Sequence, residues 1–181
     1  MTIRLYLVLL CFGAATTFAQ ITSIDLQASG LTCSMCSNAI LKSLQTLPFI
    51  EKIQSNVKTS NFHIDIKKGI TPSFDLIRKK VEDAGFFIAN LEFELQIDTL
   101  GIAADQHADL EGQLFHFMNM PAQTLQGNLR FRLLDKGFVP TKAWKKYATW
   151  TSMSCFKTGY TADCCPASSA KGTRIYHITR L

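Results

Sequence analysis

Two cysteines three positions apart are the residues of this chain best suited to specific chemistry. They belong to a turn that continues as a helical pattern, with the sequence Gly30-Leu31-Thr32-Cys33-Ser34-Met35-Cys36-Ser37-Asn38. Two thiols on such a turn can point at one position and share one soft ion. The unpaired N–H groups at a helix start carry partial positive charge, which favours the thiolate form that binds metal. Metal binding is therefore the leading hypothesis for this segment.

The type and number of the ligands indicate which ions suit them. Two sulfur atoms without a hard oxygen ligand favour Cu(I) over calcium, magnesium or manganese. Structural zinc sites usually have four ligands, whereas this loop offers two, although the motif alone does not select copper over mercury, zinc or cadmium. An exposed two-coordinate site suits exchange, because a partner's thiol can enter as a third ligand. We therefore expect metal capture, delivery or sensing, with a metal-donor or metal-acceptor protein as partner.

Three other interpretations of the cysteine pair remain open. A disulfide between Cys33 and Cys36 would simply tie the loop, and an oxidising compartment favours it. A thiol–disulfide oxidoreductase also has C-x-x-C at a helix start, but the aromatic residue before the first cysteine and the Gly-Pro-type pair between the cysteines are missing. In a third interpretation the chain docks a partner and metal binding is incidental. No catalytic constellation is recognisable elsewhere, so we expect no enzyme.

Hydrophobic periodicity predicts the elements that position the loop. Alternating residues predict strands at 24–28, 50–57, 62–66 and from Phe87 to Ile97. A helix with Ile40, Leu44 and Leu47 on its buried face ends at Pro48. A second helix opens at Thr71-Pro72, buries Phe74, Ile77, Val81 and Ala84, and ends at Gly85. The order strand, helix, strand, strand, helix, strand predicts an α+β fold, a ferredoxin-like βαββαβ sandwich.

Together with this element order, the motif from Gly30 to Cys36 resembles the heavy-metal-associated domain. This family includes copper chaperones, the amino-terminal modules of copper-transporting P-type ATPases and periplasmic mercury-binding proteins. The resemblance implies that Cys33 and Cys36 are the metal ligands. The family usually has Met where this chain has Leu31, a residue that packs beneath the loop. Phe86 stands where members often place Tyr, Lys or Phe, and would shield the ion.

The second half of the chain resembles no family that we recognise. Strands are predicted at 114–120, 129–133 and 175–179, with a short helix from Pro140 to Ala148 that turns Trp144 and Tyr147 inward. These elements predict a small β-rich domain following the sandwich, in the form of a partly open barrel.

Two groups in this half contain soft-ligand side chains. His116, Met118 and Met120 would share one face of a strand and could bind Cu(I), although methionine more often fills gaps in a core. Cys155, Cys164 and Cys165 predict a disulfide from Cys155 to one of the other two. The alternative is a second metal site that combines these sulfurs with His177.

The amino terminus and the charge distribution complete the prediction. Arg4, an apolar run and Thr17-Phe18-Ala19 predict a signal peptide at 1–19. The element order and the charge difference between the halves predict a heavy-metal-associated domain at 20–97 and a β-rich domain at 98–181. The predicted location is secreted or periplasmic, without a membrane span. Residues 98–181 have ten basic and six acidic residues. This small excess predicts a solvated face rather than a nucleic-acid site.

Overall fold

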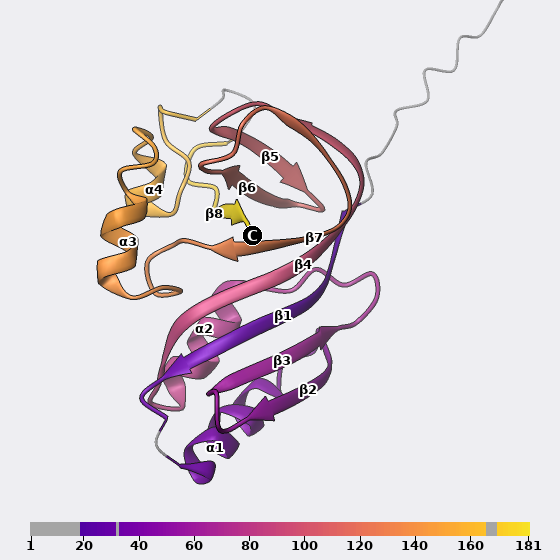
Figure 1. Ribbon diagram of the computed structural model, residues 1–181, viewed down its shortest axis with the longest axis vertical. Coiled ribbons are helices and arrows are strands. Elements are labelled where there is room, and N and C mark those ends of the chain that lie inside the picture. Colours follow the sequence, from indigo (N-terminus) through magenta and orange to yellow (C-terminus); the bar gives the residue numbers. More distant parts are fainter. Residues whose placement is uncertain (1–18, 32, 166–169) are drawn as a thin grey trace, which may run out of the picture.

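The computed structural model describes residues 19–31, 33–165 and 170–181 (Figure 1). The predicted signal peptide, apart from Ala19, and Thr32 of the cysteine loop lie outside the described residues. Within the described residues, no helix has the length and apolar character that a membrane span requires.

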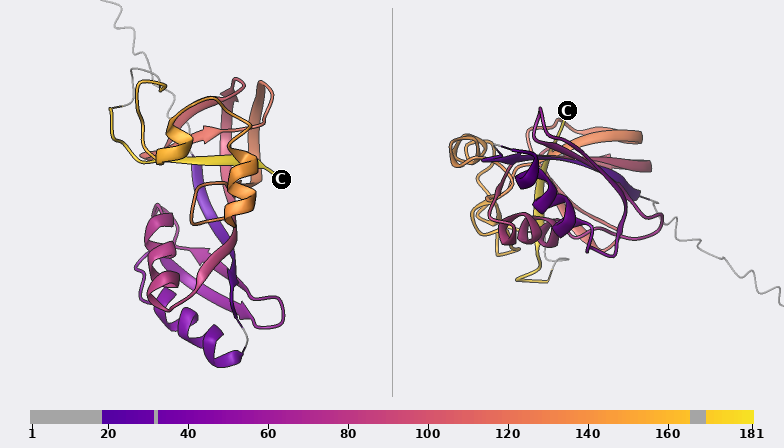
Figure 2. Two further views of the ribbon diagram at one scale, coloured as in Figure 1. Left: turned by 90° about the vertical axis from the view of Figure 1, so that its left-hand side faces the viewer. Right: turned by 90° about the horizontal axis from the view of Figure 1, so that it is seen from below.

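The first half has the predicted order of elements. These are β1 (Ala19–Ser29), α1 (Ser34–Leu44), β2 (Ile50–Asn56), β3 (Asn61–Ile66), α2 (Phe74–Asp83) and β4 (Phe87–Ile102). β2 and β3 form the predicted antiparallel hairpin, and β3, β1 and β4 continue the sheet with antiparallel pairing. Both helices lie on the same side of this sheet (Figure 2). The βαββαβ part of the predicted fold is therefore confirmed.

The start of α2 differs from the sequence prediction. Its N-cap is Ser73 rather than Thr71, because the Ser73 hydroxyl accepts a hydrogen bond from the backbone N–H of Leu76 at 3.3 Å. Pro72 consequently precedes the cap instead of occupying the first helical position. The buried face is as predicted, since Phe74, Ile77 and Val81 are fully buried. This face holds the helix against the sheet.

The second half continues the same sheet. Its elements are β5 (Gln106–Leu110), β6 (Gln113–Phe117), β7 (Gln123–Leu133), α3 (Thr141–Tyr147), α4 (Cys155–Thr158) and β8 (Ile175–Arg180). The strand order is β2-β3-β1-β4-β7-β8-β6-β5. The predicted strands and helix of this half are present, but β5 and α4 were not predicted. Trp144 of α3 is half-buried and stacks on Phe156 with ring centroids 5.8 Å apart.

β4 connects the two halves. Its residues pair with β1 along one edge and with β7 along the other, and both pairings are antiparallel. The boundary predicted between residues 97 and 98 lies inside this strand. The division of the chain into two domains at that position stays a prediction.

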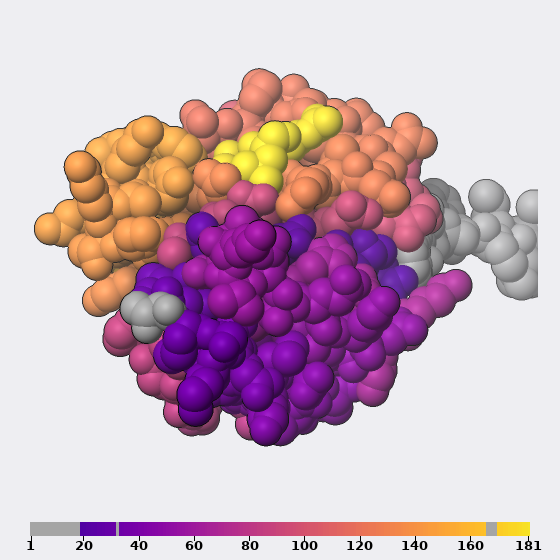
Figure 3. Space-filling model, turned by 60° about the horizontal axis from the view of Figure 1, so that its bottom comes forward, coloured from indigo at the N-terminus to yellow at the C-terminus, as the bar shows by residue number. Residues whose placement is uncertain are grey.

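An aromatic cluster occupies the junction of the halves. The Phe93 ring of β4 has its centroid 5.1 Å from Phe74, 5.9 Å from Phe131 and 6.0 Å from Phe115. The Tyr176 ring of β8 lies 5.1 Å from Phe74. One hydrophobic core therefore contains side chains from α2, β4, β6, β7 and β8. Figure 3 shows the halves meeting over a continuous surface on the face turned forward.

Candidate metal centre

Cys33 and Cys36 meet at the amino terminus of α1, as the sequence predicts. Gly30 follows β1 with a φ of 82°, a left-handed conformation that glycine adopts without a steric penalty. Cys33 is the N-cap of α1 and Cys36 lies in its first turn, so their sulfur atoms are 3.0 Å apart. The chain therefore brings both predicted ligands to one point.

The loop is open to solvent. Cys33 is exposed and Cys36 is half-buried, while the Met35 side chain between them is 81% exposed. Leu31 and Phe86 are partly buried against the main core. Leu31 thus has the packing role predicted for it, and the sulfur of Cys33 is accessible to a partner.

The electrostatics of the loop favour a thiolate. Hydrogen bonds from the Cys36 thiol and the Cys36 backbone N–H lower the pKa of Cys33. The first turn of α1 contains no acidic side chain that would oppose a negative charge. The positive end of the helix dipole acts in the same direction.

The sulfur separation is compatible with two chemical states. A disulfide bond is about 2.05 Å long. Two sulfurs that bind one ion at about 2.3 Å each can be at most about 4.6 Å apart. The observed 3.0 Å lies between these values, so a small side-chain rotation reaches either state. The five described cysteines are free thiols in the structure.

His63 lies on the surface away from any cysteine cluster. Its Nδ1 atom is 2.7 Å from Asp25 Oδ1, and its Nε2 atom is 3.3 Å from Asp65 Oδ1. The hydrogen bond with Asp25 raises the pKa of His63, although partial burial opposes the shift. His63 is thus a surface residue that contacts two carboxylates.

The three soft-ligand residues around β6 do not form the expected group. β6 ends at Phe117, so strand alternation does not extend to Met118 or Met120. Met118 packs with Leu134 and Phe156, whereas Met120 belongs to the main core. The methionines therefore fill core gaps in separate clusters, and His116 has different neighbours.

Cys155, Cys164 and Cys165 form a cluster, but without His177. Their sulfur atoms all lie within 4.8 Å of one another. His177 Nδ1 is instead 3.1 Å from Asp135 Oδ1. Burial raises the pKa of the Cys155 thiol. Burial also acts to raise the pKa of Cys164, but hydrogen bonds from Ser154 and the Cys155 N–H outweigh it and lower that pKa to about 7.

Two histidines that sequence reasoning did not connect lie beside Cys155. His107 and His116 each place a ring nitrogen within 4.8 Å of the other and of the Cys155 sulfur. Burial lowers the pKa of His116 to about 4 and also lowers the pKa of His107, so both rings are uncharged near pH 7. The sequence contains an indication that these two histidines lie opposite each other. Glu111-Gly112 can form a two-residue hairpin turn, which places His107 opposite His116.

The comparisons with known proteins concern the first half of the chain. Residues 25–87 match the sequence model of the heavy-metal-associated domain. No curated protein matches the chain significantly.

Several solved structures are similar to part of the chain. The yeast copper transporter domain Ccc2a, solved in apo and Cu(I)-loaded states, is 28% identical; the match covers 37% of this chain and 90% of that domain, with a TM-score of 0.33. A copper-binding domain from HMA7, a P-type ATPase, is 24% identical over 42% of this chain and 92% of its own, with a TM-score of 0.32.

The amino-terminal domain of ZntA in its apo form is 15% identical over 44% of this chain and 94% of its own, with a TM-score of 0.34. The assignment of the family rests on the sequence match, which includes the loop with both cysteines and the elements from β1 to α2, and which ends at the first residue of β4. This chain contains a heavy-metal-associated domain at residues 25–87.

Proposed function

We propose that Cys33 and Cys36 bind one Cu(I) ion as cargo, and that the protein captures, delivers or senses this ion outside the cytosol. The observation that carries the proposal is the 3.0 Å separation of two sulfur atoms at the exposed amino terminus of α1. The match to the heavy-metal-associated domain supports metal binding by this half of the chain.

The charge of the bound state suits the loop. Two thiolates and one Cu(I) ion have a net charge of minus one, and binding releases the two thiol protons. The positive end of α1 and the absence of an acidic side chain from its first turn favour this charge. Two-coordinate Cu(I) also leaves room for a third sulfur ligand. A partner protein can therefore take the ion by thiol exchange at the exposed Cys33.

The proposed location follows from the amino-terminal sequence. Arg4, the apolar run after it and Thr17-Phe18-Ala19 have the pattern of a cleaved signal peptide. Outside the cytosol the cysteine pair tends to oxidise, so copper binding competes with disulfide formation. A partner or reductant that keeps Cys33 and Cys36 reduced is part of this proposal.

A competition titration tests the proposal. The full chain, reduced and anaerobic, competes with a chromophoric Cu(I) chelator. We expect Cys33→Ser with Cys36→Ser to weaken Cu(I) affinity by more than about a hundredfold, since outer-shell changes alone cost 10- to 100-fold. Cys164→Ser with Cys165→Ser removes the same number of thiols and should leave the loop's affinity unchanged. Equal affinity of the wild-type protein and the loop variant would show that the loop is not the copper site.

The exposed Cys33 with its lowered pKa also suits a second function, thiol–disulfide exchange. This alternative predicts that the purified protein reduces insulin or oxidises a dithiol peptide, and that Cys33→Ser abolishes the reaction. Absence of both reactions in the metal-free wild-type protein excludes the oxidoreductase. A partner-docking role with incidental metal binding predicts that the loop variant retains its partner.

A further inference from the structure

Three histidines form a row across the strands of the second half. His107 of β5 is the register partner of His116 of β6, and His116 is the partner of His177 of β8. The ring centroids of His107 and His116 are 4.5 Å apart, and those of His116 and His177 are 5.2 Å apart. The sheet therefore aligns residues that are far apart in the sequence on one face.

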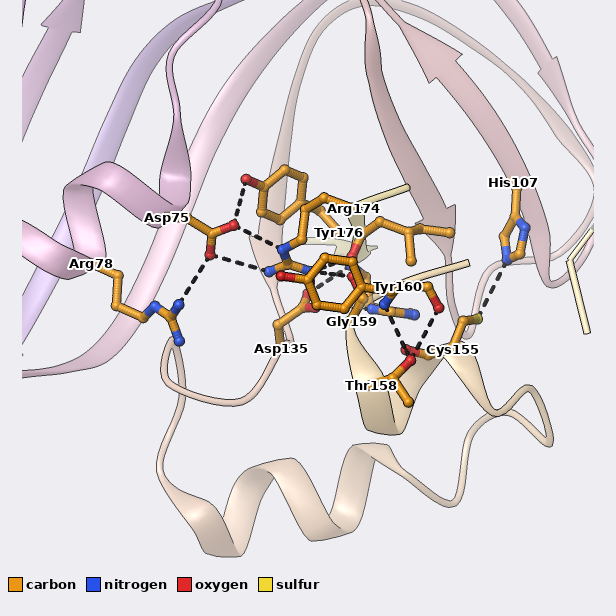
Figure 4. A network of polar contacts seen from close by, with 12 residues as sticks. Asp75, Arg78, His107, Asp135, Cys155, Thr158, Gly159, Tyr160, Arg174 and Tyr176 are labelled. Atoms are coloured by element: carbon orange, nitrogen blue, oxygen red, sulfur yellow. Dashed lines mark hydrogen bonds and ion pairs between the residues drawn. The ribbon is translucent and has the colours of Figure 1, made fainter. Parts of the chain in front are cut away.

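Cys155 of α4 approaches one end of this row. Its sulfur is 3.9 Å from His107 Nε2, and Figure 4 shows the two side chains pointing toward each other. Cys155 and His116 are fully buried, and His107 is 8% exposed. The Cys155 sulfur and the imidazole rings of His107 and His116 therefore lie together in the protein interior, away from bulk water.

Unpartnered polar atoms distinguish this group from ordinary core packing. Within the described part of the chain, the Nδ1 atoms of His107 and His116 are buried without a hydrogen-bond partner. Buried polar atoms normally have a partner, and an unsatisfied one is costly. His107 presents its Nε2 atom, rather than the unpartnered Nδ1, to the Cys155 sulfur, so both rings keep hydrogen-bonding or ligand capacity that the described protein atoms do not use.

His116 also has the support expected of a metal-binding histidine. Its Nε2 atom is 2.7 Å from Asp105 Oδ1, and the Thr151 hydroxyl donates a hydrogen bond to Asp105 Oδ2 at 3.0 Å. With a proton on Nε2 donated to the carboxylate, Nδ1 retains a free lone pair. Carboxylates commonly orient metal-binding histidines in this way.

Cys164 is the candidate fourth ligand, although it belongs to the neighbouring group around Cys155 and would have to move toward the two histidines to join them at one ion. Its sulfur lies within 4.8 Å of the Cys155 sulfur and accepts hydrogen bonds from Ser154 Oγ at 3.2 Å and from the Cys155 backbone N–H at 3.4 Å. Hydrogen bonds to the charged form of a group favour that form. The neighbouring Cys165 lacks this pair of donors among the described residues, and its backbone N–H instead donates to the Ala162 carbonyl.

We propose that His107, His116, Cys155 and Cys164 form a second metal site, a tetrahedral zinc(II) site in the second half of the chain. Two nitrogen and two sulfur ligands are a common set for structural zinc. Binding displaces the protons of the two thiols, while the imidazoles bind as neutral groups.

The net charge of the bound state favours zinc(II) over Cu(I) at this site. Two thiolates, two neutral imidazoles and zinc(II) have a net charge of zero, whereas the same ligands with Cu(I) have a charge of minus one. A buried net charge without a partner is strongly unfavourable. The exposed loop of α1 and the buried four-ligand site therefore select different ions, and zinc would fasten α4 and Cys164 to β5 and β6.

The zinc content of a variant without the two loop cysteines, used as the background for further substitutions, tests the site. The full chain with Cys33→Ser and Cys36→Ser, loaded with zinc and dialysed, should retain one zinc ion per chain. Cobalt(II) in place of zinc should give the intense visible bands and the thiolate charge transfer of a tetrahedral site with nitrogen and sulfur ligands. Failure of this test leaves the copper loop untouched, because the background lacks the loop's ligands.

Single substitutions in that background test three of the four ligands. His107→Gln, Cys155→Ser and Cys164→Ser should each weaken zinc affinity by at least about tenfold. Cys165→Ser and the exposed His63→Gln are the matched controls and should change it less than threefold. In the background protein itself, zinc should also protect Cys155 and Cys164 from alkylation, a result that does not depend on how well a variant folds.

Three results would overturn the proposal. The first is absence of stoichiometric zinc and of a tetrahedral cobalt spectrum in the folded background protein. The second is zinc affinity of Cys155→Ser or Cys164→Ser equal to that of the background. The third is a disulfide between Cys155 and Cys164 or Cys165, found by peptide mapping of protein from its own compartment, because that bond would consume a ligand.

Discussion

Asp75 in the first turn of α2 forms an ion pair with Arg174, which precedes β8, and the Oδ2 to Nε distance is 2.8 Å (Figure 4). The Tyr176 hydroxyl donates a hydrogen bond to the same carboxylate oxygen at 3.1 Å. Arg174 also contacts Asp135 Oδ1 at 3.0 Å. Helix α2 of the heavy-metal-associated domain is thereby attached to the last strand of the chain by partly buried polar contacts.

Removal of this attachment should destabilise the protein. We expect Asp75→Ala to lower the free energy of unfolding by about 1–3 kcal/mol, because Tyr176 and Arg174 lose a hydrogen-bonded charged partner. Asp83→Ala, which breaks an exposed pair with Lys79 within α2, should cost less than about 1 kcal/mol. Urea denaturation of both variants gives the comparison. Equal losses would mean that the Asp75 contacts contribute no more than a surface pair.

The shared aromatic core should make the two halves unfold together. We expect Phe93→Ala to cost about 3–5 kcal/mol, because the ring is fully buried among aromatic side chains from both halves. Phe87→Ala in the same strand is the control, since Phe87 is 68% exposed, and it should cost less than about 0.5 kcal/mol.

The denaturation curves also test the predicted boundary at residues 97 and 98. A shared core predicts one urea transition, with the same midpoint by far-ultraviolet circular dichroism and by the fluorescence of Trp144 and Trp150. Two separate midpoints would show that the halves fold as independent domains, as the sequence predicts.

Thiol reactivity should follow the different environments of the cysteines. In reduced, metal-free protein at pH 7, we expect iodoacetamide to modify Cys33 several-fold faster than Cys155. Cys33 is exposed with a lowered pKa, whereas Cys155 is buried with a raised pKa. Cys36→Ala removes the side-chain donor that lowers the pKa of Cys33 and should slow modification. Mass spectrometry of peptides quantifies both rates, and faster modification of Cys155 would contradict the structure.

His63 should stabilise the fold in a pH-dependent way. Its pKa is raised by Asp25, so its contribution is fully present below the unfolded value of 6.5 and is lost as pH rises through the folded pKa. His63→Gln should therefore lower the free energy of unfolding more at pH 5.5 than at pH 9. The difference should stay below about 1 kcal/mol, because the pair is exposed. A larger effect at pH 9 would contradict the predicted direction.

The predictions from the sequence are most accurate where local pattern decides structure. The periodic residues Ile40, Phe74 and Ile77 identify the buried helix faces correctly, and the spacing of Cys33 and Cys36 predicts that their sulfur atoms meet. A helix or strand repeats its own geometry, so hydrophobic periodicity shows which side chains face a core. Cap positions depend on finer detail, and the predicted helix opening at Thr71-Pro72 is accordingly wrong, because Ser73 is the N-cap.

Contacts between distant segments required the tertiary structure. Strand pairing aligns His107 with His116 and then with His177, and the position of α4 adds Cys155 to the first two. These contacts depend on strand register and on the packing of α4. Composition and local periodicity do not specify either, particularly for a strand as short as β5. The sequence by itself determined that Cys33 and Cys36 meet, because the two cysteines are neighbours in one helical turn. Only the tertiary structure decided the buried histidine and cysteine cluster, because the packing of α4 brings Cys155 to the hairpin that pairs His107 with His116.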